Sequence, residues 1–202
     1  MSTVLPLSGA SGPLAACLGG GGVAVFPSDT VYGLCCDPLD AAAVTRLYEL
    51  KGRPPRKPAA LLFTDLALLL ATLPELGSRT RAAARLLLPG PVTLLLANPH
   101  RRFPLAGGEL LGVRVIATGL ELPSPALQSS ANIAGGADAR SLAEVPSSIR
   151  EGADLIVDGG ELPGVPSTVI DLGEFEATGR WRLLREGALG EAAIAAAFAN
   201  LA

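Results

Sequence analysis

The chain has 202 residues, of which 49% are hydrophobic, and a formal net charge of −3 at neutral pH. This length fits one large domain, and the hydrophobic content excludes disorder of the whole chain. A protein that binds nucleic acid usually carries a surplus of basic residues, because its affinity comes from neutralising phosphates. The chain as a whole has no such surplus. We therefore expect a globular protein with a single domain over residues 1–202.

No segment has the pattern of a targeting or membrane sequence. Residues 1–22 contain no Lys or Arg, whereas a secretory signal begins with a basic region. The longest apolar runs, such as 66–73, are far shorter than the ~20 residues that span a bilayer. Cys17, Cys35 and Cys36 show neither metal-ligand spacing nor a disulfide framework, which is typical of free thiols in a reducing compartment. These observations predict a cytoplasmic protein without a membrane segment.

Short apolar runs alternate with segments of helical periodicity along the chain. Asp40 is a predicted N-cap, because apolar residues recur at helical spacing after it until Gly52. The pattern predicts helices at 14–18, 40–52, 65–72, 78–88, 141–150 and 188–201, and strands at 23–26, 31–34, 61–63, 92–97, 113–116, 154–158, 168–172 and 181–184. Strands interleaved with helices predict an α/β or α+β fold, in which helices pack on a sheet.

The first candidate ligand segment is Pro27–Leu34, which begins where a predicted strand ends. Ser28, Asp29 and Thr30 follow the proline, and strand ends of α/β sheets are common sites of ligand binding. Taken alone, these residues are better explained as a Ser/Asp turn that binds no ligand.

The second candidate is the basic segment 51–58, which contains Lys51, Arg53, Arg56 and Lys57. Three prolines stiffen it, so its cations cannot all spread freely into solvent. Clustered cations bind polyphosphates by charge and by bidentate Arg contacts. Both lysines of the chain lie here, and Lys differs from Arg in presenting a compact charge. A solvated basic loop is the alternative, and a Walker A motif is excluded because no Gly-Lys-Ser/Thr is present.

The remaining candidates are short and individually weak. Segment 128–136 contains Ser130 and Asn132, whose side chains can hold phosphate oxygens or a base edge, but an Asx or Ser turn has the same composition. Ser167 and Arg185 lie in two further short segments. His100 is the only histidine and lies in a polar turn-like stretch, so we expect a solvated loop residue without a catalytic role.

Taken together and in this order, these segments resemble the YrdC-like threonylcarbamoyl-AMP synthase family. The resemblance rests on seven motifs in register: Pro27–Leu34, Lys51–Pro54, Pro89–Thr93, Val113–Arg114, Ser130–Asn132, Ser167–Val169 and Leu184–Gly187. It covers residues 20–190 approximately. The resemblance implies a twisted mixed sheet flanked by helices, with a positively charged central cavity.

The resemblance also implies an activity. Members of the family form threonylcarbamoyl-AMP and pyrophosphate from L-threonine, bicarbonate and ATP, for threonylcarbamoyladenosine modification of tRNA. Carried over by position, Thr30, Arg114 and Ser167 hold L-threonine, whereas Arg53, Lys57, Ser130 and Arg185 hold ATP, with Lys51 and Asn132 lining the same site. The resemblance implies two partners: a tRNA threonylcarbamoyl-transfer complex and RNA, which would bind weakly.

Such phosphoryl chemistry requires alignment and positive charge more than a protein nucleophile. We accordingly assign no catalytic side chain. No Asp/Glu cluster indicates a metal site built by the protein, so we expect Mg²⁺ to arrive with the nucleotide.

The chain departs from the family pattern at four places. Ser28 stands where the family often has Thr, and Leu62 stands where some members carry a His. Asp138 replaces a Ser, and segment 115–128 is too short for a helix that usually precedes Ser-Ala-Asn. These departures concern the threonine pocket more than the ATP site.

Two alternatives have different chemistry. A carbamoyl-adenylate module uses carbamoyl phosphate on the same fold, but such modules normally sit inside larger carbamoyltransferases. A binding protein for double-stranded RNA or ribosome precursors would use the charge of the cavity, but the net charge of −3 argues against a broad basic face.

Overall fold

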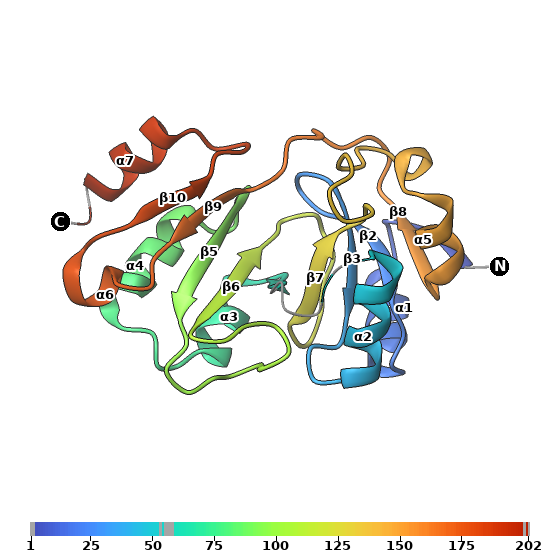
Figure 1. Cartoon of the computed structure of the whole chain (residues 1–202), viewed down its shortest axis with the longest axis horizontal. Helices are drawn as coiled ribbons and strands as arrows, with labels where there is room; N and C mark the ends of the chain where they lie inside the picture. The colour runs from blue at the N-terminus through green and yellow to red at the C-terminus, as the bar shows by residue number, and fades with distance from the viewer. Residues whose placement is uncertain (1–2, 53, 55–58, 200, 202) are drawn as a thin grey trace.

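The computed structural model describes residues 3–52, 54, 59–199 and 201. Within them, ten strands form one mixed sheet in the order β1-β8-β2-β3-β7-β4-β6-β5-β9-β10, with helices packed against it (Figure 1). The predicted α/β class with a twisted mixed sheet is confirmed. None of the helices in this part of the chain combines the length and apolarity needed to cross a membrane.

The strands are β1 (Thr3–Pro6), β2 (Ala24–Pro27), β3 (Tyr32–Cys36), β4 (Ala60–Phe63), β5 (Val92–Ala97), β6 (Leu110–Val115), β7 (Ala126–Ser130), β8 (Leu155–Asp158), β9 (Thr168–Asp171) and β10 (Arg182–Arg185). The helices are α1 (Ser11–Gly19), α2 (Ala41–Leu50), α3 (Leu66–Thr72), α4 (Ser78–Leu87), the 3₁₀ turn η1 (Leu142–Glu144), α5 (Ser147–Gly152), α6 (Phe175–Thr178) and α7 (Glu191–Ala199). Each predicted element has an observed counterpart, most with shifted ends and 92–97 with the bounds of β5, but the predicted ranges do not include β1, β7 or α6.

One predicted helix is wrong in its continuity. Segment 141–150 forms η1 and then α5, with Pro146 between them. Proline has no backbone N–H to donate and disfavours helical geometry in the residue before it, so one continuous helix cannot form. The candidate ligand segment 128–136 begins inside a strand, because Gln128, Ser129 and Ser130 belong to β7.

The helix starts follow from their sequence. The side chain of Asp40 accepts hydrogen bonds from the N–H groups of Ala42 and Ala43 at 2.9 and 3.1 Å, which satisfies two donors of the first turn of α2. Val44 and Leu47 then lie on the buried face of α2, which packs on β3. The predicted N-cap is therefore confirmed.

Helices cover the sheet at both of its ends. In Figure 1, α1, α2 and α5 lie beside β8, β2 and β3, whereas α4, α6 and α7 lie beside β5, β9 and β10. The larger hydrophobic cluster contains Tyr32 and Leu94, and a second cluster beneath α1 contains Leu14 and Phe26. The site described below lies on the sheet between these two ends.

The segment between β6 and β7 contains no helix. Instead, Ile116, Leu120 and Leu122 pack into the second hydrophobic cluster together with Leu62, which is only 1% exposed. The position at which some relatives were expected to carry a His is therefore filled by a buried apolar side chain.

Candidate active site

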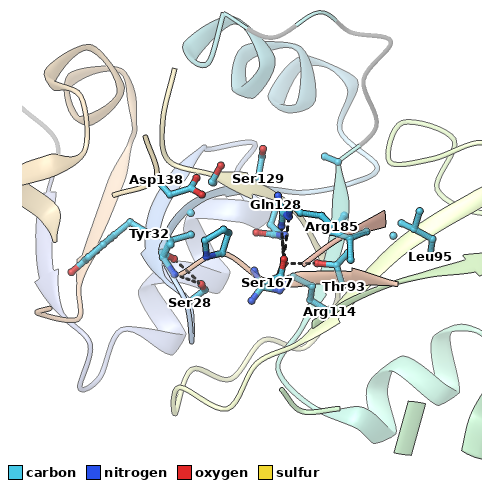
Figure 2. Close-up of a pocket in the computed structure, with 18 of the residues that line it drawn as sticks. Ser28, Tyr32, Thr93, Leu95, Arg114, Gln128, Ser129, Asp138, Ser167 and Arg185 are labelled. Carbon is cyan, nitrogen blue, oxygen red and sulfur yellow. Dashed lines mark hydrogen bonds between the residues drawn. The ribbon is translucent and has the colours of Figure 1, made fainter. Parts of the chain in front are cut away.

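A cavity of about 530 Å³ lies on the central part of the sheet (Figure 2). Strands β3 to β7, β9 and β10 and the segments next to them contribute its walls. Its polar lining residues are Ser28, Thr93, Arg114, Gln128, Ser129, Ser130, Asp138, Ser167 and Arg185. The cavity therefore brings together residues from six of the seven sequence motifs.

The turn after β2 is held by Ser28. Its hydroxyl donates to the carbonyl oxygen of Val31 at 2.6 Å and accepts from the N–H groups of Thr30 and Val31, each at 3.2 Å. This is the local pattern that makes Ser favourable in turns. The Ser turn expected from the sequence is confirmed, and it also fixes the position of Asp29 and Thr30.

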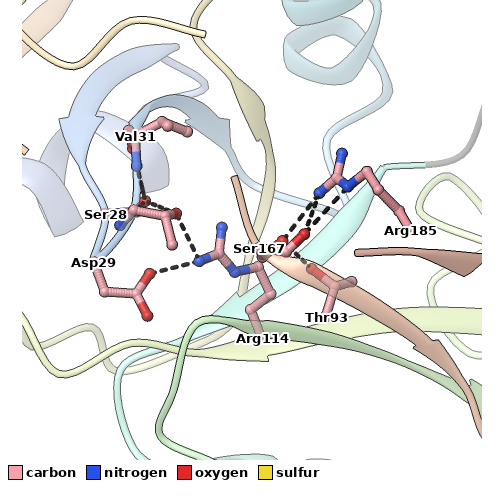
Figure 3. A network of polar contacts seen from close by, with 8 residues as sticks. Ser28, Asp29, Val31, Thr93, Arg114, Ser167 and Arg185 are labelled. Carbon is pink, nitrogen blue, oxygen red and sulfur yellow. Dashed lines mark hydrogen bonds and ion pairs between the residues drawn. The ribbon is translucent and has the colours of Figure 1, made fainter. Parts of the chain in front are cut away.

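Arg114 on β6 meets this turn from across the sheet (Figure 3). Its Nη2 donates to Asp29 Oδ1 at 2.5 Å and to Thr30 Oγ1 at 3.1 Å. The Arg114 side chain is only 4% exposed, and its Nε is buried without a hydrogen-bond partner among the described residues. A buried guanidinium N–H without a partner is costly, so this atom is a candidate contact for a ligand.

Burial dominates the electrostatics of this pair. Burial lowers the pKa of Arg114, and Arg185 lowers it further, whereas Asp29 acts in the opposite direction. Burial likewise raises the pKa of Asp29 above its ordinary value, although Arg114 opposes this shift. Both charges therefore lie in a medium that strengthens electrostatic interactions, including those with a bound anion.

A second group of hydroxyls lies on the opposite wall. Parallel pairing of β5 with β9 brings Thr93 Oγ1 within 2.8 Å of Ser167 Oγ. Arg185 on β10 donates from Nη2 to the backbone oxygen of Ser167 at 2.7 Å and to Ser167 Oγ at 3.2 Å (Figure 3). The site assignment from sequence missed Thr93, although this residue ends the Pro89–Thr93 motif and could have been included on that ground.

The Ser130–Asn132 segment forms a compact polar network behind the cavity wall. Ser130 Oγ donates to Asn132 Oδ1 at 2.8 Å, and Lys51 Nζ donates to the backbone oxygens of Ser130 and Asn132. Asn132 Nδ2 lies 3.3 Å from Oδ1 of Asp138, which itself lines the cavity. Lys51 is 2% exposed and is not among the lining residues.

One side of the cavity is apolar and includes Leu95, Leu110 and Val169. Gly112 on β6 lies in the same wall, and a Cβ placed there would lie 3.3 Å from Ala60 Cβ. A side chain at this position would therefore crowd Ala60 on the neighbouring strand β4.

The described residues contain no cluster of three or more His, Cys, Asp or Glu side chains that could hold a metal ion. His100 is exposed in a turn. Cys35 and Cys36 are buried free thiols, and burial raises the pKa of both, to about 12 for Cys36. They lie in different hydrophobic clusters, which confirms that neighbouring strand residues point to opposite faces.

The predicted site residues fall into three groups. Thr30, Arg114, Ser130, Ser167 and Arg185 line the cavity or directly contact a residue that lines it, whereas Lys51 and Asn132 lie behind Ser130. Arg53 and Lys57 lie outside the described residues. The assignment of each residue to L-threonine or ATP stays a prediction, as does the positive charge of the cavity.

Comparison with known proteins identifies the family of the chain. The model of the Sua5/YciO/YrdC family, described as "Telomere recombination", matches residues 16–187. The chain belongs to the Sua5/YciO/YrdC family. The resemblance inferred from the seven motifs is thereby confirmed.

Individual relatives of this Sua5/YciO/YrdC protein differ in length. It is 36% identical over 193 residues to a threonylcarbamoyl-AMP synthase of Thiobacillus denitrificans, covering 89% of the chain and 98% of the relative. It is 34% identical over 178 residues to that of Pyrococcus abyssi, covering 84% of the chain but only 51% of the relative. The structure of P. abyssi Sua5 complexed with L-threonine is similar, with a TM-score of 0.82 and 29% identity over 98% of this chain and 60% of the other.

Proposed function

We propose that the chain forms threonylcarbamoyl-AMP and pyrophosphate from L-threonine, bicarbonate and ATP, as a nucleotidyltransferase. The observation that carries this proposal is Arg114, a buried guanidinium at a cavity wall whose Nε has no partner among the described residues. Relatives with the name of this activity, and a similar Sua5 structure complexed with L-threonine, support it.

In this proposal the amino acid lies between the two hydroxyl-bearing walls. Arg114 pairs with its carboxylate, because a guanidinium meets a carboxylate with strong charge-assisted hydrogen bonds. Thr30 and Ser167 lie on opposite sides of the bound amino acid and form hydrogen bonds with its hydroxyl or with the carbamate. Ser130, Arg185, Arg53 and Lys57 hold ATP. Asn132 lies behind Ser130 and supports it.

The chemistry follows from positioning and charge. The neutral amine of threonine attacks carbon dioxide derived from bicarbonate, forming a carbamate and releasing a proton. A carbamate oxygen then attacks the α-phosphorus of ATP, and the bond to the β-phosphate breaks as pyrophosphate leaves. Arg114 and Arg185 stabilise the negative charges of the reactants without forming a covalent bond.

Magnesium fits this proposal only as part of the nucleotide. Mg²⁺ is commonly bound by substrate phosphates with one or two carboxylates, and the described residues offer no larger acidic cluster. Bound to ATP, it would neutralise phosphate charge. We further propose that the protein acts in the cytoplasm and delivers its product to a tRNA threonylcarbamoyl-transfer complex.

The test is a pyrophosphate-release assay with ATP and bicarbonate across all twenty amino acids. We expect release that depends on L-threonine and on bicarbonate. Release that instead depends on carbamoyl phosphate, without any amino acid, would overturn the proposal in favour of a carbamoyl-adenylate module. Salt-dependent binding of double-stranded RNA without any pyrophosphate release would indicate the RNA-binding alternative.

A further inference from the structure

Lys51 follows the last residue of α2 and is almost completely buried, with 2% of its surface exposed. Its Nζ donates to the backbone oxygen of Ser130, to the backbone oxygen of Asn132 at 2.9 Å and to Asn132 Oδ1 at 2.9 Å. A lysine ammonium has three N–H donors. These three acceptors therefore match all of its donors.

The hydrogen-bonding groups of the Asn132 side chain also have partners within the protein. Its Oδ1 accepts from Lys51 Nζ and from Ser130 Oγ, and its Nδ2 contacts the backbone oxygen of Gly136 at 2.7 Å and Asp138 Oδ1 at 3.3 Å. An amide side chain offers two donor hydrogens and two acceptor lone pairs. Both side chains are therefore engaged within the protein.

A backbone contact strengthens the connection. The N–H of Ala134 donates to the backbone oxygen of Lys51 at 2.8 Å. Lys51 thus binds the segment after β7 through its side chain and its main chain, although the two segments are about 80 residues apart in sequence. This double attachment fixes Ser130 at the cavity wall.

We propose that Lys51 is a positioning residue, whose ammonium fixes the Ser130–Asn132 segment rather than contacting the triphosphate of ATP. This inference rests on the proposed function for the identity of the nucleotide. A contact between Nζ and a phosphate would require at least one of three internal hydrogen bonds to break. The compact ammonium fits between two carbonyl oxygens and an amide oxygen, whereas the planar fork of Arg does not. This accounts for a lysine here in a chain whose other cations are almost all arginines.

Two substitutions of Lys51 separate positioning from phosphate contact. Lys51→Met keeps the length of the side chain and removes the charge, whereas Lys51→Arg keeps a charge that binds phosphate well but has the wrong shape. We expect both variants to raise the Kd for ATP by about tenfold or more, because the Ser130–Asn132 segment loses the charge-assisted hydrogen bonds that hold it in its binding position. If Lys51→Arg retains wild-type ATP affinity while Lys51→Met loses it, the inference is wrong. Arg85→Met, which removes an exposed cation of α4, is the matched control and should leave ATP binding unchanged.

A double-mutant cycle tests whether Lys51 acts through the segment. Asn132→Leu removes the amide but leaves the cation, and by itself it should weaken ATP binding. In the Asn132→Leu protein Lys51 keeps its two backbone acceptors, so Lys51→Met should still weaken ATP binding, but by less than it does in the wild type, because residues that act as one unit have non-additive effects. Additive losses would show that Lys51 contacts the nucleotide independently and would overturn the inference.

Hydrogen–deuterium exchange gives a readout that needs neither nucleotide nor turnover. In the ligand-free protein, Lys51→Met, or Asn132→Leu if the first variant does not fold, should speed exchange of amides 131–136 while amides of β5 and β6 stay protected. Unchanged exchange at 131–136 would contradict the inference. If the wild type releases no pyrophosphate in response to threonine, the proposed function is wrong. The exchange result still decides whether Lys51 positions the Ser130–Asn132 segment, because it requires neither nucleotide nor turnover.

Discussion

Asp29 Oδ1 lies 2.5 Å from Arg114 Nη2, so the protein itself places a carboxylate on the guanidinium proposed to bind the substrate. Thr30 Oγ1 accepts from the same nitrogen at 3.1 Å. Nη2 is therefore occupied, whereas Nε has no partner among the residues that the structure describes. Asp29 consequently affects both the orientation of the guanidinium and the net charge of the pocket.

These two effects are separable by substitution of Asp29. Asp29→Asn keeps an oxygen acceptor for Nη2 and removes one negative charge, so L-threonine should bind at least as tightly as in the wild type. Asp29→Ala removes the acceptor as well, so the guanidinium loses its orientation and L-threonine binding should weaken. Both variants should lose stability, by up to about 3–5 kcal/mol when the partner of a buried charge is removed.

Isothermal titration with L-threonine and urea unfolding measure the two quantities. Equal weakening of L-threonine binding in Asp29→Asn and Asp29→Ala would contradict the separation of charge from orientation. Serine, titrated in parallel, shows whether the effect concerns the shared carboxylate.

Arg114→Ala should abolish most activity. The proposed contact is to the α-carboxylate, so turnover with threonine and with serine should fall together, by about two orders of magnitude or more for a lost positioning contact. We expect threonine to be preferred over valine, since a site that pairs a hydroxyl rejects an analogue lacking it. Full activity of Arg114→Ala with threonine would exclude the pocket assignment and favour the carbamoyl-phosphate alternative. Pyrophosphate release with each amino acid is the measurement.

The sequence predicts much of the fold because the physical signals are local. Asp40 caps α2, and apolar periodicity marks the core-facing side of that helix. The edge strand β1 gives no comparable signal, because its residues Thr3–Pro6 are largely exposed and pair only with β8. Local pattern cannot reveal a strand whose existence depends on a partner about 150 residues away.

The site was only partly predictable for a similar reason. Motifs identified Ser167 and Arg114, but spacing along the chain does not show that Thr93 contacts Ser167, which requires pairing of β5 with β9. Lys51 illustrates the opposite problem. Its charge suggests a phosphate ligand, and only the three-dimensional contacts show that its ammonium is directed to Ser130 and Asn132.

Cys35 and Cys36 should be dispensable for chemistry. The thiolate is the reactive form of cysteine, and burial raises the pKa of both thiols well above neutrality. The double Cys35→Ser/Cys36→Ser variant should therefore retain turnover if it folds, with some loss of stability from burying hydroxyls. Circular dichroism establishes folding, and the pyrophosphate assay measures turnover. A folded variant without any turnover would refute this prediction.

Asp154 should make stability depend on pH. Burial acts to raise the pKa of this carboxyl, but hydrogen bonds from Arg46 and from the N–H of Val23 outweigh it and lower the pKa below the ordinary value of 3.8. A depressed carboxyl pKa stabilises the fold above the unfolded-state pKa, and this contribution is lost as the pH falls through the folded-state pKa. Asp154→Asn should therefore lower the melting temperature at pH 6–7, and the difference from wild type should shrink below about pH 4. A constant difference across this range would contradict the assignment.

Thr93→Val tests the hydroxyl pair that the sequence did not reveal. Valine keeps the β-branched shape preferred in a strand, so β5 should stay intact. The change removes the 2.8 Å contact to Ser167 Oγ and, among the described residues, leaves Arg185 as the side chain that still contacts this hydroxyl. A lost hydrogen bond of this kind is worth about 0.5–1.5 kcal/mol, which corresponds to L-threonine binding about two- to twelvefold weaker. Thr93→Ser keeps the hydroxyl and is the matched control, expected to bind nearly as wild type. If Thr93→Val binds L-threonine with wild-type affinity, Thr93 does not orient Ser167 toward the amino acid, and Arg185 alone sets the position of that side chain.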